Sequence, residues 1–140
     1  QQYAGGDYEP VFSWAATAAH VDARSAQEHV TLVMRLEAEN DSGMWLEKEM
    51  EFQRLGGVVV TYRWDPDAFP SFSFFAPELS VAHDVELQCE PEAEIWKYPI
   101  TTVGRSETGL EETVQGISVT PRWSTSLGEV RVRPLLPCKL

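Results

Sequence analysis

Short segments in which apolar and polar residues alternate are the strongest constraint on the fold of this chain. They occupy residues 30–37, 44–52, 58–64, 79–87 and 117–123. Side chains alternate between the two faces of a strand, so each segment can bury one face of a sheet, whereas no long stretch shows the i, i+3, i+4, i+7 spacing of an amphipathic helix. Nine prolines and nine glycines are spread through the 140 residues. The pattern predicts an all-β, antiparallel β-sandwich of about eight to ten strands.

The whole chain, residues 1–140, is expected to form a single domain, with residues 1–10 as a lead-in. At this length a two-layer core buries about two-thirds of the surface of the unfolded chain. Residues 12–20 fit either a short helix or the end of a strand. No repeat or linker divides the sequence.

Residues 53–57 contain two glycines and are predicted to connect a β-hairpin. Matching the apolar faces of residues 44–52 and 58–64 fixes the register, because a slip of one residue would bury the glutamates. Two residues interrupt the alternation: Trp45 falls on the acidic face and Lys48 on the apolar one. Such local exceptions are places to look for a site. The predicted register pairs Phe52 with Val58, Met50 with Val60, and Glu47 with Arg63.

The formal net charge of −11 argues against some classes of partner. A phosphate backbone would be repelled, so nucleic acid is not an expected partner. Neutral polymers such as glucans are unaffected by this charge. No window is long and apolar enough for a membrane helix, and the first residues lack a signal-peptide pattern. No membrane partner is expected, and the chain reads as a processed or excised piece.

Two cysteines, Cys89 and Cys138, are present. Their spacing fits neither a zinc ribbon nor a redox motif, which leaves a long-range disulfide or two buried thiols. We favour the disulfide, which would suit an extracellular, secreted protein. The acidic turns at residues 39–41 and 65–67 lack the loop spacing of an EF-hand and are interpreted as Asx turns. We therefore expect no metal and no cofactor.

The histidines and carboxylates of the sequence do not predict a catalytic site. A mutarotase-like enzyme needs a histidine and a carboxylate placed as acid and base. His83 falls on an apolar strand face, which favours a core position, and His20 and His29 flank a polar segment. Glycosidases use paired carboxylates, but 22 acidic residues make chance pairs inevitable. We expect a protein that is not itself an enzyme.

The five tryptophans and residues 95–116 point instead to sugar recognition. Trp96 and Tyr98 lie two residues apart, so they share a face of an extended chain and can form a flat platform for a sugar ring. Trp45 is expected to be accessible on the acidic face. Trp64 and Trp123 end apolar runs and more often close a core. The residues that follow Tyr98 are interpreted as a glycine-punctuated acidic loop, in which hydrogen-bonding side chains would accompany the platform. The complete set of candidate carbohydrate-binding residues is Trp96, Tyr98, Trp45, Glu107, Gln115, Lys48, Trp123 and Trp64.

The same stretch carries a family resemblance. The run W-x-Y-P-I-x-T-V-x-x-S-E-x-G-x-E-x-x-x-Q-G, residues 96–116, resembles the C-terminal β-sandwich of 4-α-glucanotransferases and related amylolytic enzymes of glycoside hydrolase family 57. Residues 44–52, 56–64 and 74–82 resemble earlier strands of that domain. Leu110 and Val114 stand where aromatic residues are expected, and no catalytic barrel precedes the domain. The resemblance implies a galactose-mutarotase-like sandwich from a protein that acts on α-glucan.

These observations predict a non-catalytic carbohydrate-binding module that recognises α-glucan, such as starch, glycogen or maltooligosaccharide, as an accessory to an amylolytic enzyme. A covalently linked or packed catalytic domain is the expected protein partner. Two alternatives remain open. One is a structural domain that only packs against a catalytic barrel, and the other is a mutarotase-like enzyme.

Overall fold

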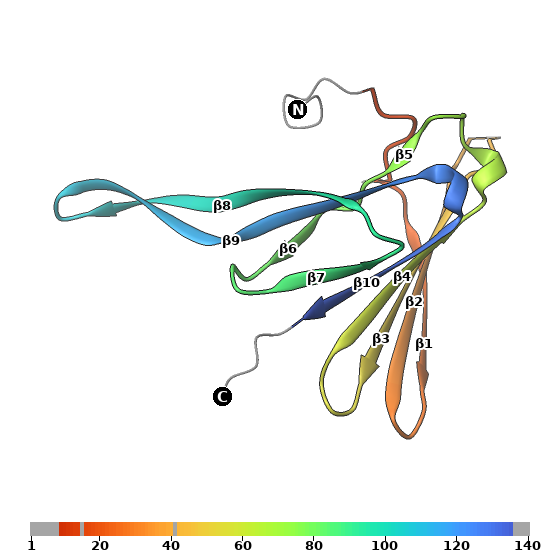
Figure 1. The fold of residues 1–140 in the computed structure, drawn as a ribbon, viewed down its shortest axis with the longest axis horizontal. Coiled ribbons are helices and arrows are strands. Elements are labelled where there is room, and N and C mark those ends of the chain that lie inside the picture. The colour runs from red at the N-terminus through yellow and green to blue at the C-terminus, as the bar shows by residue number, and fades with distance from the viewer. Residues whose placement is uncertain (1–8, 15, 41, 136–140) are drawn as a thin grey trace.

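The computed structural model describes residues 9–14, 16–40 and 42–135. Within these ranges the protein forms ten β-strands and two short 3₁₀ helices, with no α-helix (Figure 1). The expected all-β antiparallel sandwich is confirmed. The elements are β1 (Ala19–Ser25), β2 (His29–Glu37), β3 (Trp45–Gln53), β4 (Val58–Trp64), η1 (Pro66–Ala68), β5 (Phe74–Phe75), β6 (Leu79–Val81), β7 (Glu86–Glu90), β8 (Glu94–Ser106), β9 (Gly109–Ser124), η2 (Thr125–Leu127) and β10 (Glu129–Leu135).

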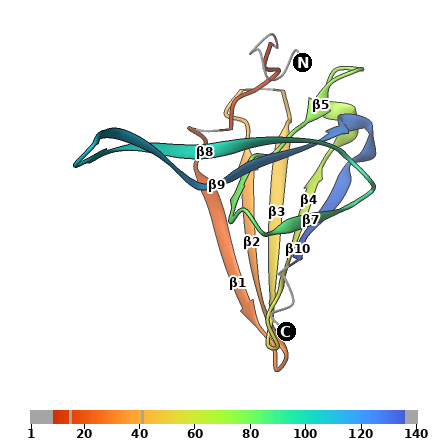
Figure 2. The same cartoon turned by 60° about the vertical axis from the view of Figure 1, so that its left-hand side comes forward.

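Two antiparallel sheets make up the sandwich. The larger has six strands in the order β1-β2-β3-β4-β10-β7. In the smaller sheet, the long strand β9 pairs with β8 and also with the short strands β5 and β6. Figures 1 and 2 show β8 and β9 crossing the strands of the larger sheet and then projecting beyond them as a two-stranded arm.

The alternating sequence pattern set the pairing of β3 with β4. Phe52 lies opposite Val58, Met50 opposite Val60, and Glu47 opposite Arg63, so the predicted register is confirmed. This register keeps the glutamates on the outer face of the larger sheet and turns the apolar side chains towards the smaller sheet. The physical reason is the one expected: a one-residue slip would exchange the two faces.

The core lies between β9 and the inner faces of β3, β4 and β10. Its buried members are Leu46, Val60, Tyr62, Trp64, Trp123, Val130 and Val132. Complete burial of one such side chain contributes roughly 1.5–3 kcal/mol to folding. Because β10 comes from the C-terminal part of the chain and β3 from the N-terminal part, long-range pairing closes the core.

Three local expectations differ from the structure. Residues 79–87 are not one strand: β6 ends at Val81, a turn closed by a hydrogen bond from Val85 N to Ala82 O (3.1 Å) follows, and β7 begins at Glu86. His83 lies exposed in this turn, so its predicted core position is wrong. Residues 95–116 form most of the β8–β9 hairpin rather than a loop. The sequence left helix and strand open for residues 12–20; the described residues 12–14 and 16–20 contain no helix, and a strand begins at Ala19.

Candidate functional site: an aromatic cleft

The predicted platform residues Trp96 and Tyr98 lie on β8, on one face of the strand. Trp96 pairs with Thr120 and Tyr98 with Ser118 of β9. Trp96 is half-buried, and Tyr98 is 37% exposed. The common face expected from their spacing is therefore present, but only Tyr98 offers much of its ring to solvent.

Glu107 and Gln115 lie along the projecting part of the hairpin. Glu107 is exposed in the turn that joins β8 to β9. Gln115 lies at a register shift between the two strands, where its Nε2 donates a hydrogen bond to Oγ1 of Thr102 (3.0 Å). Nine residues of extended chain separate Tyr98 from Glu107, a span of roughly 30 Å. Glu107 and the aromatic platform therefore cannot hold the same sugar ring.

Trp45 and Lys48 lie on opposite faces of β3. The Arg35 guanidinium carbon lies 4.3 Å from the centre of the Trp45 ring, and Trp45 is half-buried. Trp45 therefore lies on the acidic face as predicted, but a neighbouring arginine stacks on its ring and leaves it only partly accessible. Lys48 lies on the inner face, with Nζ 5.8 Å from the centre of the Tyr62 ring.

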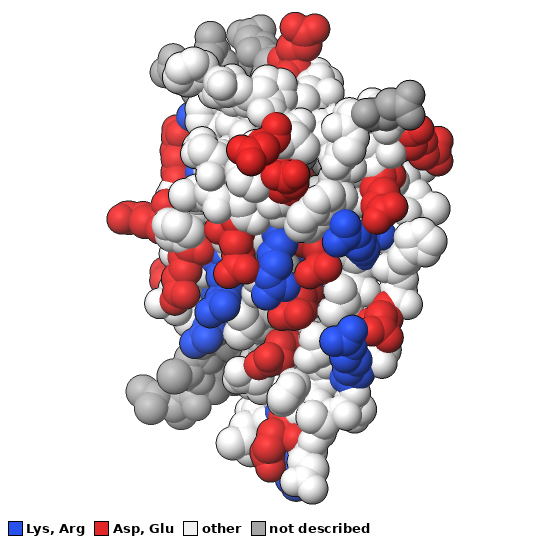
Figure 3. All heavy atoms as spheres, turned by 90° about the vertical axis from the view of Figure 1, so that its right-hand side faces the viewer, with Lys and Arg blue, Asp and Glu red and all other residues white. Residues whose placement is uncertain are grey.

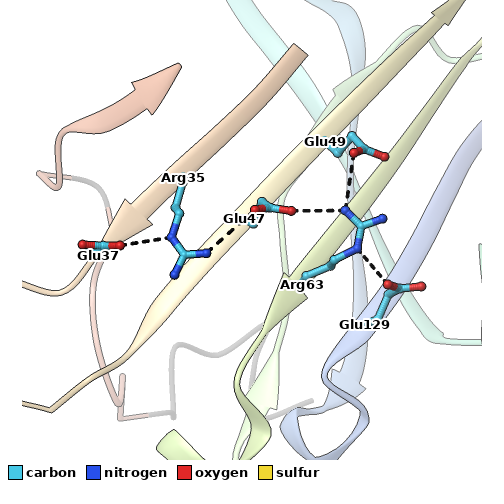
Figure 4. Close-up of polar contacts among 6 residues, drawn as sticks. All are labelled: Arg35, Glu37, Glu47, Glu49, Arg63 and Glu129. Carbon is cyan, nitrogen blue, oxygen red and sulfur yellow. Dashed lines mark hydrogen bonds and ion pairs between the residues drawn. The ribbon is translucent and has the colours of Figure 1, made fainter. Parts of the chain in front are cut away.

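A network of ion pairs occupies the outer face around Trp45. Acidic and basic side chains intermingle on this side of the molecule (Figure 3). Nη1 of Arg63 lies 3.2 Å from Glu47, and its Nε lies 2.8 Å from Glu129 (Figure 4). Burial by itself would lower the pKa of Arg63, but the hydrogen bond to Glu129 and the charge of Glu49 raise that pKa overall. Two arginines, Arg35 and Arg63, thus offset part of the charge of the four carboxylates of this network, Glu37, Glu47, Glu49 and Glu129.

Trp64 and Trp123 belong to the core, and each is 3% exposed. The indole nitrogen of Trp64 donates a hydrogen bond to Thr125 O (2.6 Å), and that of Trp123 donates to Pro91 O (2.8 Å). The eight residues predicted for the site therefore lie on the outer face, on the inner face of β3, in the core, on β8 and on the hairpin arm. The structure does not bring them together in one place.

A cleft of about 740 Å³ brings together a different set of aromatic residues. Its walls come from the N-terminal segment 9–14, from residues 69–77 before and around β5, and from the ends of β3, β4 and β9. Trp64 is the predicted residue that reaches it. The rings that line the cleft are Phe12, Trp14, Tyr62, Trp64, Phe69, Phe72, Phe74 and Phe75.

The rings at the floor of the cleft are packed against the core. The ring centres of Phe75 and Trp64 are 4.8 Å apart, and those of Phe75 and Tyr62 are 5.1 Å apart. Burial raises the pKa of Tyr62 to about 12, so its phenol stays protonated at neutral pH. On the wall from the N-terminal segment, Phe12 and Trp14 meet edge to face at 4.7 Å.

The rim of the cleft combines exposed rings with a charged group. The Arg122 guanidinium carbon lies 4.5 Å from the centre of the Phe74 ring, and its Nη2 donates to Glu94 at 2.5 Å. Phe74 is 56% exposed and Phe72 is 95% exposed. Phe72 also has a φ of 64°, in the left-handed region that a bulky residue seldom adopts. Such conformations cost about 1–3 kcal/mol and concentrate at functional sites, so the exposure of Phe72 suggests a binding role.

This arrangement suits a ligand with flat apolar faces and polar edges. The rings offer stacking surfaces, while Arg122 and Glu9 offer a donor and an acceptor at the edge. Among the described lining residues Glu9 is the one carboxylate, whereas cleavage of a glycosidic bond normally needs two. The rings, Arg122 and Glu9 together have the chemistry for binding.

Sequence reasoning missed this cleft, although one signal was present. Residues 69–75 read FPSFSFF and hold four of the six phenylalanines of the chain. An alternating strand pattern accounts for two of them at most, which leaves the others in need of an explanation.

The described part of the chain holds no group of three or more His, Cys, Asp or Glu side chains placed to bind a metal ion. None of its helices is long and apolar enough to span a membrane.

Burial raises the pKa of the Cys89 thiol. Cys138 lies outside the described residues, so its pairing with Cys89 stays a prediction.

The structure is an antiparallel β-sandwich with an aromatic cleft at one end. Residues 71–133 match the model of the family described as "Alpha-amylase/4-alpha-glucanotransferase, C-terminal", and the chain resembles that C-terminal domain. The structure is similar to the crystal structure of the 4-alpha-glucanotransferase from Thermococcus litoralis, with a TM-score of 0.51 and 21% identity over 84% of this chain. The chain spans 22% of that protein's length, so the similarity concerns the fold of one part of it. No curated protein sequence matches the chain.

Proposed function

We propose that this chain is a non-catalytic, carbohydrate-binding accessory module of an amylolytic enzyme, and that its aromatic cleft binds α-glucan. The observation that carries the proposal is the cleft itself, with the exposed rings of Phe72 and Phe74 beside Arg122. The family match supports it, because the matched residues 71–133 include all three of these side chains. We also propose that the parent enzyme is secreted into a medium that contains glucan.

The physical basis is the shape of a glucose unit. The axial C–H groups of the ring pack on an aromatic face, and its hydroxyl groups bond to charged or amide side chains at the edge. The cleft volume lies within the range of about 300–1,000 Å³ that is usual for small-ligand sites. Because stacking must offset the cost of ordering a flexible chain, we expect a dissociation constant of roughly micromolar to millimolar.

Affinity electrophoresis with and without soluble starch tests the proposal. Phe72→Gly removes an exposed ring, and each such contact is worth about 0.5–1.5 kcal/mol, so we expect an affinity loss of about threefold to tenfold. Phe72→Tyr keeps the ring and should keep the affinity. Leu55→Gly is the matched control, because Leu55 is 98% exposed in the turn between β3 and β4 and does not line the cleft.

Two results would contradict the proposal. Equal retardation of the unchanged protein with and without starch would remove glucan as the ligand. Release of reducing sugar from starch by the pure protein would contradict its non-catalytic nature.

A second function, packing against a catalytic domain, is favoured by the β8–β9 arm. Val103, Leu110 and Val114 are exposed on one face of this arm. An isolated two-stranded ribbon is marginally stable in water, so three exposed apolar side chains on one face of it favour a covering surface, although Arg105 and Glu112 share that face. In a chain that carries the catalytic domain, Leu110→Ser should lower the melting temperature of that domain. The same change should leave starch binding unaltered.

A further inference from the structure

Strand β1 ends the larger sheet with an open backbone edge. Within the described residues it pairs with β2 on one side and with no strand on the other. Six of its seven residues, from His20 to Ser25, are exposed. An open edge of this length presents backbone N–H and C=O groups that a further strand can pair with, which proteins normally prevent.

The charges on β1 are arranged for pairing with a second copy of itself. Asp22 and Arg24 lie on the outer face two residues apart, with 2.9 Å between their charged groups. A two-fold axis through Ala23, perpendicular to the sheet, places Asp22 of one copy opposite Arg24 of the other, twice per dimer. Opposite charges directly across a strand pair stabilise it, and like charges destabilise it.

The apolar face beside this edge also fits a second copy. Val21 is 60% exposed on the inner face, and Val30 of the neighbouring strand is 46% exposed. The same two-fold register sets Val21 opposite Ser25 of the second copy, and Ser25 pairs with Val30. Val21, Ser25 of the second copy and Val30 beside it then lie in one row across the three neighbouring strands, on the inner face of the joined sheet.

The other edge of the sheet has the opposite character. Strand β7 carries Glu86, Gln88 and Glu90 on one face, all exposed. Pairing two copies of β7 about Gln88 would place Glu86 opposite Glu90, which repels. Charge therefore favours self-pairing at β1 and opposes it at β7.

We propose that two copies of this chain associate through antiparallel pairing of their β1 strands about Ala23, which joins the two six-stranded sheets into one continuous sheet. The proposal is independent of glucan binding, because β1 does not line the cleft. Sedimentation equilibrium at about 0.15 M salt, which screens the net charge of −11, measures the association.

Charge reversal tests the register. Asp22→Arg and Arg24→Asp, each alone, put like charges opposite one another and should weaken the dimer tenfold or more. An equal mixture of the two variants should associate again, because the facing strands then carry opposite charges. The double variant Asp22→Arg, Arg24→Asp should also dimerise. Glu112→Arg on the hairpin arm is the control, since it reverses one charge far from β1 and should leave the dimer intact.

Each outcome bears on the proposal. A monomer at the highest soluble concentration overturns it. A dimer that ignores both single substitutions, or single variants that fail to associate when mixed, overturns pairing through β1. Circular dichroism of each variant checks that the fold is kept. Amides of β1 should exchange with deuterium more slowly as protein concentration rises, which a dimer formed elsewhere would not cause.

Discussion

Phe72 has a strained backbone conformation and an exposed ring. Its φ of 64° suits glycine better than phenylalanine. Phe72→Gly relieves this strained backbone conformation, which stabilises the folded state. Glycine also gives the unfolded chain more conformational freedom, which destabilises the folded state, so the two effects oppose each other. We therefore expect the free energy of unfolding to stay the same or rise by up to about 1 kcal/mol while starch affinity falls. Urea denaturation checks the first part, and a loss of stability of more than about 1 kcal/mol would show that Phe72 packs in the fold.

Tyr62 should make the protein sensitive to alkali. Its pKa is raised to about 12 by burial, whereas an unfolded tyrosine has a pKa near 10. The folded state thus retains a proton that the unfolded state loses, so this stabilisation is complete below about pH 10 and disappears as the pH rises through about 12. The loss should reach about 2–3 kcal/mol.

Tyr62→Phe provides the comparison, because phenylalanine fills the same space without an ionisable group. Chemical denaturation at several pH values from about 9 to 12 should show a shallower fall of stability for this variant. Identical pH profiles for both proteins would mean that the phenol of Tyr62 ionises without unfolding.

The aromatic residues show what single-residue patterns can predict. Alternation assigned Trp64 to the end of an apolar run, and it lies in the core. Alternation also placed Trp45 on the outer face, but it gave no information about Arg35, a residue of the neighbouring strand that covers the ring. Face assignment follows from position within one strand, whereas exposure depends on the strand beside it.

Close packing of β6 against β9 depends on Gly116. A Cβ atom at this position would lie 2.7 Å from the carbonyl oxygen of Val81, a backbone atom that cannot move alone. Gly116→Ala should therefore cost about 1–3 kcal/mol of stability. Gly104→Ala is the matched control on the same hairpin, since a Cβ there meets nothing within 4 Å. Thermal melting of both variants decides the point, and equal melting temperatures would show that β6 shifts freely.

Elements with one buried face were predictable, and elements without one were not. The β3–β4 register followed from apolar alternation and a short glycine turn. The arm of β8 and β9 exposes almost every side chain on both faces from Thr101 to Gln115, so no hydrophobic pattern marked it as strand. The break between β6 and β7 was missed because apolar residues continue the alternation through the turn.

The cleft depends on the fold as a whole. Trp14, Phe72 and Arg122 come from three distant parts of the sequence and meet only after β9 has paired with β5. The resemblance of residues 95–116 pointed to the right class of domain. However, it led to predicted site residues on the hairpin, whereas the cleft lies at the other end of β9, near Trp123 and Ser124.

The net charge of the whole molecule opposes binding of anionic polymers but does not affect binding of a neutral glucan. The net charge of −11 repels anions, and the ion pairs on the outer face leave no cluster of unpaired arginines around Arg63. Stacking of a neutral sugar releases no counterions. Starch affinity should therefore be unchanged by a tenfold rise in salt, from about 0.1 M to about 1 M, although the screening length falls from about 10 Å to about 3 Å. A sulfated glucan should not be retained even at low salt, because its charges meet a surface of the same sign. Affinity electrophoresis on gels that contain starch or the sulfated glucan measures the salt dependence of starch affinity and the retention on the sulfated polymer. Starch retardation that weakens steeply with salt would contradict this prediction, because it would mean that charge-dependent contacts, and not ring stacking alone, hold the glucan.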